Sequence, residues 1–390
     1  MRLGAAAAYV AVAASRRVLV LRRVWLRVHR LLALGVGFVF ALMGLTGSLN
    51  VFGPELDRWL NPDLRVAAEG RAQRPINELV AAIKSAHPRR YGAWTLIMPG
   101  GDGDAVTAWY ERPVETDGEF YAPLMVSVDP YTARVIDSRF WGDTVSTWIL
   151  ELHGELFMGE FGRRLVGVIG MLLAVSLLTG LSLWWPGRAR VRAALRVRLT
   201  GSRLRALFDL HRVSGVCAAP ILLAVAFSGF TFAYPGALGG WFSSSSPMSD
   251  LHSVLGVRST AAPTSAPLHA GAALLVARGL FPRSDLTRIV TPEDASGTYQ
   301  FWFSAESPAS DSVVCVDQYS GQILHVERAH QPDSGTRAQG FLYALHTGRV
   351  LGAPGRLTWS LVGLVPALLF VSGILRWRQQ RQTGPRRVFG

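Results

Sequence analysis

The residues of this chain that could do chemistry are histidines at the starts of its long apolar segments. His29 and His211 are each followed by an arginine, and Gly47 and Gly229 lie 18 residues further on in each case. A neutral imidazole is a common metal ligand, and a histidine beside or inside a lipid bilayer is costly unless it has a partner. These two positions are therefore candidates for a metal or cofactor site.

A second pair of histidines, His153 and His346, repeats with a different pattern. Each precedes an arginine by ten residues, a glycine by 27 and a tryptophan by 31. The residues are Arg163, Gly180 and Trp184 in the first copy and Arg356, Gly373 and Trp377 in the second. Because three spacings agree, we expect an internal duplication of the chain.

Four segments are apolar enough to cross a membrane, and they determine where the histidines lie. Residues 31–52, 165–185, 213–234 and 357–375 contain no Asp, Glu or Lys, and all end in or include a Thr-Gly or Ser-Gly pair. Each is close to the ~20 residues that a spanning helix needs. The mean hydropathy of +0.25 also favours a membrane protein over several soluble domains. We therefore predict a four-helix transmembrane bundle.

The net charge of +13 is concentrated in three segments. Residues 1–30 hold seven Arg and no acidic residue, residues 187–210 hold seven Arg and one Asp, and the tail after Leu375 holds five Arg and no acidic residue. Such segments are typical of the cytoplasmic side. We expect both termini in the cytoplasm and residues 53–162 and 235–356 outside. Nucleic acid is not an expected partner, because no basic-aromatic motif accompanies the arginines.

The N-terminal segment leaves one alternative open. Gly4–Ala14 is short, apolar and rich in alanine after Arg2, as in the core of a cleaved signal peptide. The double arginines at 16–17 and 22–23 favour a cytoplasmic segment instead. His29 stays in the mature chain under either interpretation.

The two outer segments have the same predicted order of elements, a helix followed by four strands. In the first, Ile76, Leu79, Val80 and Ile83 share one helical face. Its strands are expected at 94–98, 106–111, 124–128 and 133–137. The second has an expected helix at 267–280 and strands at 286–291, 299–303, 313–316 and 321–327. Each half of the chain is thus a span, an α+β lobe and a second span.

Two turns and the four histidine starts together have the pattern of a known family. The turns are Asp129-Pro-Tyr-Thr and Asp317-Gln-Tyr-Ser, and the starts are Leu-His in one pair and His-Arg in the other. With these motifs the chain resembles the bacterial PepSY-associated transmembrane family over nearly its whole length. Members of that family include inner-membrane ferric-siderophore reductases that carry two b-type haems and reduce iron on the periplasmic side.

The expected fold is a membrane α-helical protein, with a four-helix transmembrane bundle from an internal duplication and two periplasmic α+β lobes that resemble PepSY domains. The expected segments are a cytoplasmic N-terminal segment 1–30, a transmembrane helix 31–52, a lobe 53–150, an interfacial segment with the second transmembrane helix 151–186, a cytoplasmic loop 187–210, a third transmembrane helix 211–234, a second lobe 235–340, an interfacial segment with the fourth transmembrane helix 341–377, and a cytoplasmic tail 378–390.

Bis-imidazole ligation of haem iron needs one histidine from each of two facing helices at the same depth. The predicted topology puts His29 level with His211 and His153 level with His346, so we expect two haem b groups with these axial ligands. Arg30 and Arg212 are also explained as membrane anchors. Four arginines near the ligands are candidates to pair with haem propionates: Arg30, Arg212, Arg163 and Arg356.

The expected function is an inner-membrane oxidoreductase that carries electrons across the bilayer to ferric iron in the periplasm, and the resemblance implies a ferric siderophore or another ferric chelate as substrate. The chain has no flavin, dinucleotide or Walker motif. Electrons must therefore come from a cytoplasmic reductase or from quinol. Two alternatives are a general transmembrane cytochrome b and a non-catalytic sensor or peptidase-regulating protein. A transporter is disfavoured, because the spans lack acidic residues and lysine.

Overall fold

The computed structural model describes residues 2–68, 70–198, 202–235, 256–259, 266–304, 311–328 and 334–382. The chain forms two compact units. A helical unit comprises Met1–Phe52, Ile149–Ala237 and Leu342–Gly390, and a sheet unit comprises Gly53–Trp148 and Leu238–Phe341. Of the expected tail 378–390, residues 383–390 lie outside the described residues.

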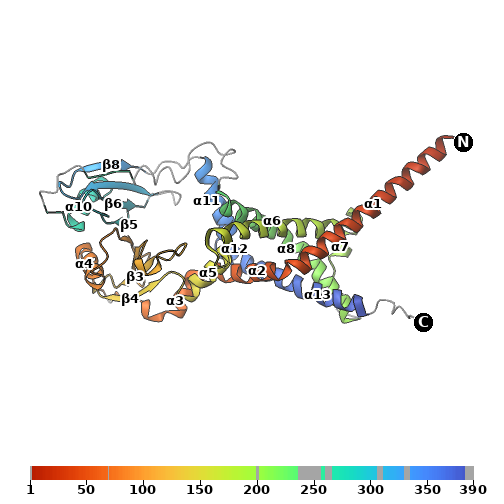
Figure 1. Ribbon diagram of the computed structural model, residues 1–390, viewed down its shortest axis with the longest axis horizontal. Coiled ribbons are helices and arrows are strands. Elements are labelled where there is room, and N and C mark those ends of the chain that lie inside the picture. The colour runs from red at the N-terminus through yellow and green to blue at the C-terminus, as the bar shows by residue number, and fades with distance from the viewer. Residues whose placement is uncertain are drawn as a thin grey trace. The chain divides into compact units, whose positions relative to one another are not determined.

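The helical unit has long apolar helices arranged side by side (Figure 1). By length and composition, α6 (Gly159–Trp184), α8 (Arg203–Ala233) and the segment Arg349–Gln382 can each cross a membrane, as can the bent pair α1 (Arg2–Gly35) and α2 (Gly37–Asn50) if it is one span. Segment Arg349–Gln382 contains α12 (Gly352–Gly363) and α13 (Val365–Gln382). Helix α6 packs on α1 and α8, and α13 packs on α8 and α2. Spans one and three are therefore diagonal to one another, as are spans two and four.

The first span differs from the sequence prediction. We expected a cytoplasmic segment, 1–30, followed by a single span, 31–52, but α1 continues to Gly35 and meets α2 at a bend of 63°. The break is at Val36, between Gly35 and Gly37. Glycine weakens a helix, and Gly37 is needed for close packing, since a methyl group there would lie 2.7 Å from Cδ2 of Phe370.

Short helical pieces precede the second and fourth spans, in the segments where the sequence predicts interfacial stretches. Helix α5 (Val145–Glu155) ends in the left-handed residues Leu156 and Phe157, with φ of 52° and 57°. Helix α11 (Ser334–His346) ends before Gly348, which has φ 73°, and a 3-10 turn η5 (Arg349–Leu351) follows. These breaks place His153 and His346 in the pieces ahead of the spans.

The sheet unit contains one eight-stranded antiparallel sheet, whereas the sequence suggested two separate lobes. The strand order is β4-β3-β2-β1-β5-β6-β7-β8. Strands β1 and β5 pair, with Leu96 opposite Ile289. The pairing satisfies the backbone groups of two edges that separate sheets would have left open. The strands are β1 (Thr95–Ile97), β2 (Val106–Tyr110), β3 (Leu124–Val128), β4 (Val135–Phe140), β5 (Leu286–Val290), β6 (Thr298–Phe303), β7 (Ser312–Asp317) and β8 (Ile323–Glu327).

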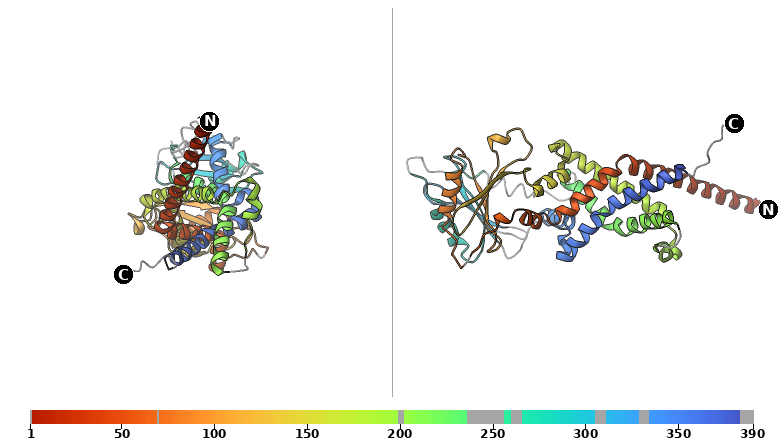
Figure 2. Two further views of the ribbon diagram at one scale, coloured as in Figure 1. Left: turned by 90° about the vertical axis from the view of Figure 1, so that its right-hand side faces the viewer. Right: turned by 90° about the horizontal axis from the view of Figure 1, so that it is seen from below.

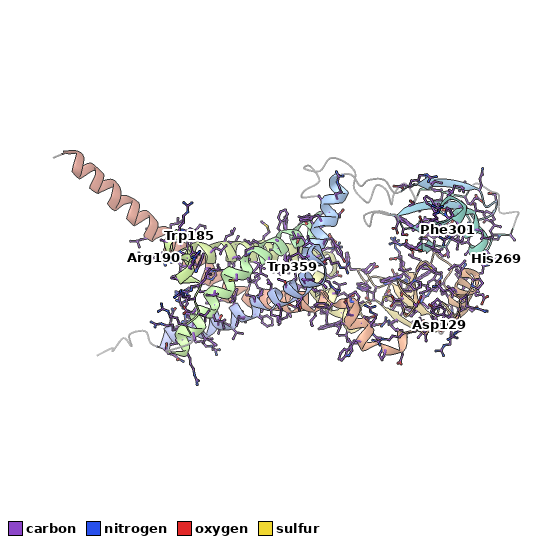
Figure 3. The ribbon with its side chains drawn as sticks, turned by 180° about the vertical axis from the view of Figure 1, so that it is seen from behind. Asp129, Trp185, Arg190, His269, Phe301 and Trp359 are labelled. Atoms are coloured by element: carbon purple, nitrogen blue, oxygen red, sulfur yellow. The ribbon has the colours of Figure 1, made fainter. Side chains whose placement is uncertain are left out.

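Two helices cover one face of this sheet. Helix α4 (Ile76–Ala86) buries Leu79 and Ile83, and α10 (Ala270–Leu280) buries Ala273 and Ala277 against the same core. Phe301 on β6 is fully buried in that core (Figure 3). The unit thus has a hydrophobic core of its own. Its other short elements are α3 (Gly53–Leu60), η1 (Pro62–Leu64) and η2 (Val114–Thr116), and the helical unit adds η3 (Arg188–Arg190) and α7 (Val191–Ala194).

Candidate functional site

All four predicted histidines lie in the helical unit, and each imidazole contacts the Thr-Gly or Ser-Gly pair of another span. His29 on α1 contacts Thr179 near the end of α6. Conversely, His153, which precedes α6, contacts Thr46 on α2. The third and fourth spans make the same kind of reciprocal contact. The contacts there are His211 with Ser372 and His346 with Ser228.

The hydrogen bonds of His29 determine which ring nitrogen carries the proton. Its Nδ1 lies 3.0 Å from the carbonyl oxygen of Ser176 and 3.2 Å from Oγ1 of Thr179. A carbonyl oxygen can only accept a hydrogen bond, so Nδ1 is protonated and donates. The lone pair of His29 Nε2 is therefore available to a metal.

The other three histidines reach the same state through a hydroxyl group. Oγ of Ser372 donates its hydrogen to the carbonyl of Leu368 at 2.7 Å and lies 2.8 Å from Nδ1 of His211. A hydroxyl has one hydrogen, so the oxygen must accept from Nδ1–H of the histidine. Thr46 and Ser228 donate to their own helices in the same way, and contact Nδ1 of their histidines at 3.0 and 2.9 Å.

The glycine of each pair makes room for the ring. A methyl group on Gly47 would lie 2.9 Å from Cε1 of His153, and one on Gly180 or Gly229 would lie 3.2 or 3.3 Å from Cε1 of the contacting histidine. At Gly373 the corresponding distance, to Cε1 of His211, is 3.7 Å. The hydroxyl residue therefore holds the ring by Nδ1 while the glycine lets it approach the helix.

His153 and His346 come together as a facing pair, which we call the contact pair. Their ring centroids are 6.2 Å apart and their planes are inclined by 62°. Phe232 on α8 lies against His346, with centroids 5.2 Å apart. Both histidines precede the spanning helices, and burial lowers the pKa of each to about 4. Both rings are thus neutral near pH 7, as metal ligation requires.

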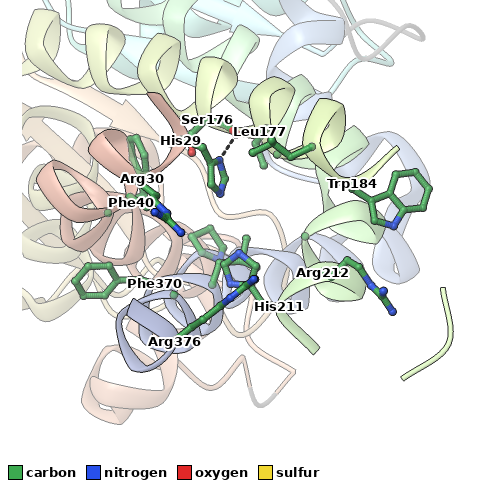
Figure 4. A pocket seen from close by; sticks show the side chains of 18 of the residues that line it. His29, Arg30, Phe40, Ser176, Leu177, Trp184, His211, Arg212, Phe370 and Arg376 are labelled. Carbon is green, nitrogen blue, oxygen red and sulfur yellow. Dashed lines mark hydrogen bonds between the residues drawn. The ribbon is translucent and has the colours of Figure 1, made fainter. Parts of the chain in front are cut away.

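His29 and His211, which we call the cavity pair, line a cavity of about 560 Å³. This volume lies within the ~300–1,000 Å³ typical of small-molecule and cofactor sites. In the close view the two rings project into the cavity from α1 and α8 (Figure 4). Its walls are largely apolar and its rim carries arginines. The apolar wall includes Phe40, Leu173, Leu177, Leu222, Pro366 and Phe370.

The four predicted arginines have different surroundings. Arg30 and Arg212 line the cavity, but Arg212 pairs with Asp209 at 3.0 Å. Arg163 pairs with Glu160 at 2.9 Å. Arg356 donates to the carbonyl oxygen of Val51, 2.7 Å from Nη2, at the end of α2. The matched sequence positions 163 and 356 thus make different contacts.

The cavity also contains functional candidates that the sequence prediction missed. Arg376 on α13 lines it together with Arg22, and so do Trp184 and Trp377. Nε1 of Trp184 is buried without a hydrogen-bond partner among the described residues. The shared spacing of the two tryptophans from His153 and His346 was the available signal, since it places both at one end of the bundle. Arg376 was hidden among the arginines of the tail.

The model of the family described as PepSY-associated TM region matches residues 26–380. The chain therefore belongs to the PepSY-associated transmembrane family. No curated protein matches it.

Proposed function

For this member of the PepSY-associated family, we propose a membrane oxidoreductase that holds two b-type haems, one at the cavity pair and one at the contact pair. One observation carries the proposal. Four imidazoles are each held at Nδ1 by a hydroxyl or carbonyl oxygen of a neighbouring helix, which leaves Nε2 free. Metal-ligating histidines are oriented in this manner.

The number of donors favours haem over a metal ion bound by side chains alone. Among the described parts of the chain, no group of three or more His, Cys, Asp or Glu could hold a metal ion. A structural zinc site needs about four such ligands, whereas haem iron has ring nitrogens of its own and takes axial ligands from the protein. Two imidazoles are therefore sufficient at each site.

The spacing of the contact pair supports the same assignment. A metal ion binds an imidazole nitrogen at ~2 Å, so two rings that would hold one ion lie several ångströms apart. The centroids of His153 and His346 are 6.2 Å apart. His153 and His346 would hold the iron of one haem, and His29 and His211 that of the other.

The positions of the two sites suit electron transfer across a bilayer. His211, of the cavity pair, and Ser228, which holds His346 of the contact pair, lie 17 residues apart on the continuous helix α8. At ~1.5 Å per residue this is about 25 Å, close to the ~30 Å of the hydrocarbon core. A haem supplies reversible one-electron transfer when bound. The chain would fix the rings, keep them neutral and surround them with apolar walls.

The direction of electron transfer and the identity of the substrate rest on different arguments. The arginine-rich segments favour a bacterial inner membrane with both termini in the cytoplasm and with the cavity pair near the cytoplasmic side. Electrons from a reductase or quinol would enter there and leave at the contact pair for ferric iron in the periplasm. The family resemblance supplies the ferric siderophore as substrate.

Proteoliposomes of known orientation test this function. We expect a reductant on the cytoplasmic face to reduce a ferric siderophore on the other face, detected by a ferrous chelator there. His153→Ala and His29→Ala should each abolish the signal, because the two sites act in series. His87→Ala, in the sheet unit, is the control and should leave it unchanged. A wild-type rate in His153→Ala would instead favour the sensor interpretation.

A further inference from the structure

Two arginines at the rim of the cavity have no anionic partner within the described ranges of the chain. Arg30 on α1 and Arg376 on α13 both line the cavity that contains the cavity pair. Both extend into it on the same side (Figure 4). Among the described residues, no ion pair joins either of them to a carboxylate.

A hydrogen bond to α13 holds Arg30 beside the helical turn that follows Arg376. Nη2 of Arg30 donates to Oε1 of Gln380 at 3.0 Å, and Gln380 lies one helical turn after Arg376. The guanidinium carbon of Arg376 lies 3.9 Å from the centroid of the Phe208 ring. A guanidinium stacked on an aromatic ring keeps its N–H groups in its own plane, where they can bind a carboxylate with two bonds.

In the described part of the chain, no carboxylate neutralises this pair. In residues 1–52, 161–237 and 342–390 the only acidic residue is Asp209. Its carboxylate already binds Arg212 at 3.0 Å and the backbone nitrogen of Arg198 at 3.2 Å. Two like charges beside one cavity, with no carboxylate between them, are complementary to an anion from outside the chain.

The cavity therefore combines two imidazoles, apolar walls and a cationic rim. We propose that Arg30 and Arg376 form a carboxylate clamp that selects a tetrapyrrole with free acid groups for the cavity pair. The proposal rests on haem binding by His29 and His211. In this proposal Arg376, and not Arg212, acts together with Arg30, because Asp209 neutralises Arg212.

The clamp is tested in a full-length chain carrying His153→Ala and His346→Ala, so that only the cavity site can load. The haem-free protein in neutral detergent is titrated with haemin and with haemin dimethyl ester, and the Soret band reports binding. We expect haemin to bind more tightly than the ester. Arg30→Gln and Arg376→Gln should each reduce this preference by about tenfold, the typical effect of losing one charge-assisted hydrogen-bonded pair. Arg376→Lys should give an intermediate value.

The control is Arg378→Gln, on the same helix but not in the cavity wall, which should keep the full preference. An unchanged preference in both Arg30→Gln and Arg376→Gln, with haemin still bound, would overturn the clamp and leave the haem assignment intact. Binding of neither compound would contradict both. If the substitutions changed affinity only in nanodiscs that contain phosphatidylglycerol, the arginines would bind lipid phosphate, and the clamp would again be wrong.

Discussion

The cavity pair and the contact pair each consist of two imidazoles held at Nδ1 by oxygen atoms of other spans, yet their surroundings differ. The cavity pair borders about 560 Å³ of space with arginines at its rim. The contact pair has its rings 6.2 Å apart beside Phe232, while Arg163 and Arg356 bind elsewhere. The difference separates two tasks. Contacts with the Thr-Gly and Ser-Gly pairs hold the imidazoles at both ends of the bundle, and the cavity pair in addition borders open space and arginines.

Removing a histidine should have the largest effect and tests whether the pairs are independent. His29→Ala and His211→Ala should remove the same haem, and His153→Ala and His346→Ala the other, because a haem with one axial ligand is held far more weakly. Visible spectra and haem content per chain measure this. Different spectra for His29→Ala and His211→Ala, with identical spectra for His29→Ala and His153→Ala, would mean that the pairing is wrong.

A series of glycine-to-alanine substitutions should show how closely each imidazole approaches the neighbouring helix. The effect on haem affinity should be greatest for Gly47→Ala, where the new methyl group would lie 2.9 Å from His153, and least for Gly373→Ala, where the distance is 3.7 Å. Gly180→Ala and Gly229→Ala should be intermediate. Haem titration of the four variants gives the order, and Gly279→Ala, with open space around it in the sheet unit, is the control. Equal effects at all four positions would contradict these differences in the distance between glycine and imidazole.

Removing a hydroxyl should affect both pairs alike. Ser372→Ala and Ser228→Ala each take away the acceptor for Nδ1–H of one histidine. Loss of such a partner typically lowers metal affinity ~10–100-fold, and we expect a change in that range with the Soret band of only one haem altered. Ser214→Ala is a matched control, since its hydroxyl bonds only to its own helix. If this control behaved like Ser372→Ala, the effect would come from the helix and not from the ligand.

Arg163 and Arg356 occupy matching positions of the repeat, but their substitution should lower the stability by different, modest amounts. Arg356→Ala removes the donor to the carbonyl of Val51 and should cost about 1–3 kcal/mol of stability. Arg163→Ala removes an exposed ion pair with Glu160, worth no more than ~1 kcal/mol. Thermal unfolding compares the two variants. Equal losses would show that the two sites share a role after all.

Sequence patterns identified the four histidines and most of the strands, because both are marked by patterns within short stretches of sequence. Of the expected helical face, Ile76, Leu79 and Ile83 are buried and Val80 is partly buried, and β3 has the predicted bounds. The role of each arginine depends on the residues around it, and the repeated spacing does not specify these residues. Glu160 stands three residues before Arg163, but Ala353 occupies the matching position before Arg356.

Two larger features needed three-dimensional contacts. The pairing of β1 with β5 makes one sheet from segments that are nearly 200 residues apart in the sequence, and each segment read alone predicts a lobe. The Thr-Gly and Ser-Gly pairs were visible as the ends of apolar segments, but their contact with histidines of other spans depends on the rotation of each helix about its axis. Hydropathy does not specify that rotation, because lipid and apolar side chains are equally compatible with a spanning helix.

The haem content of the purified wild-type chain tests the central claim most directly. A pyridine-haemochrome assay on folded protein from haem-supplied cells should give two haems per chain, both low-spin with two imidazole ligands by electron paramagnetic resonance. A folded preparation without haem, or a single haem that persists in all four histidine variants, would contradict the assignment of the two pairs.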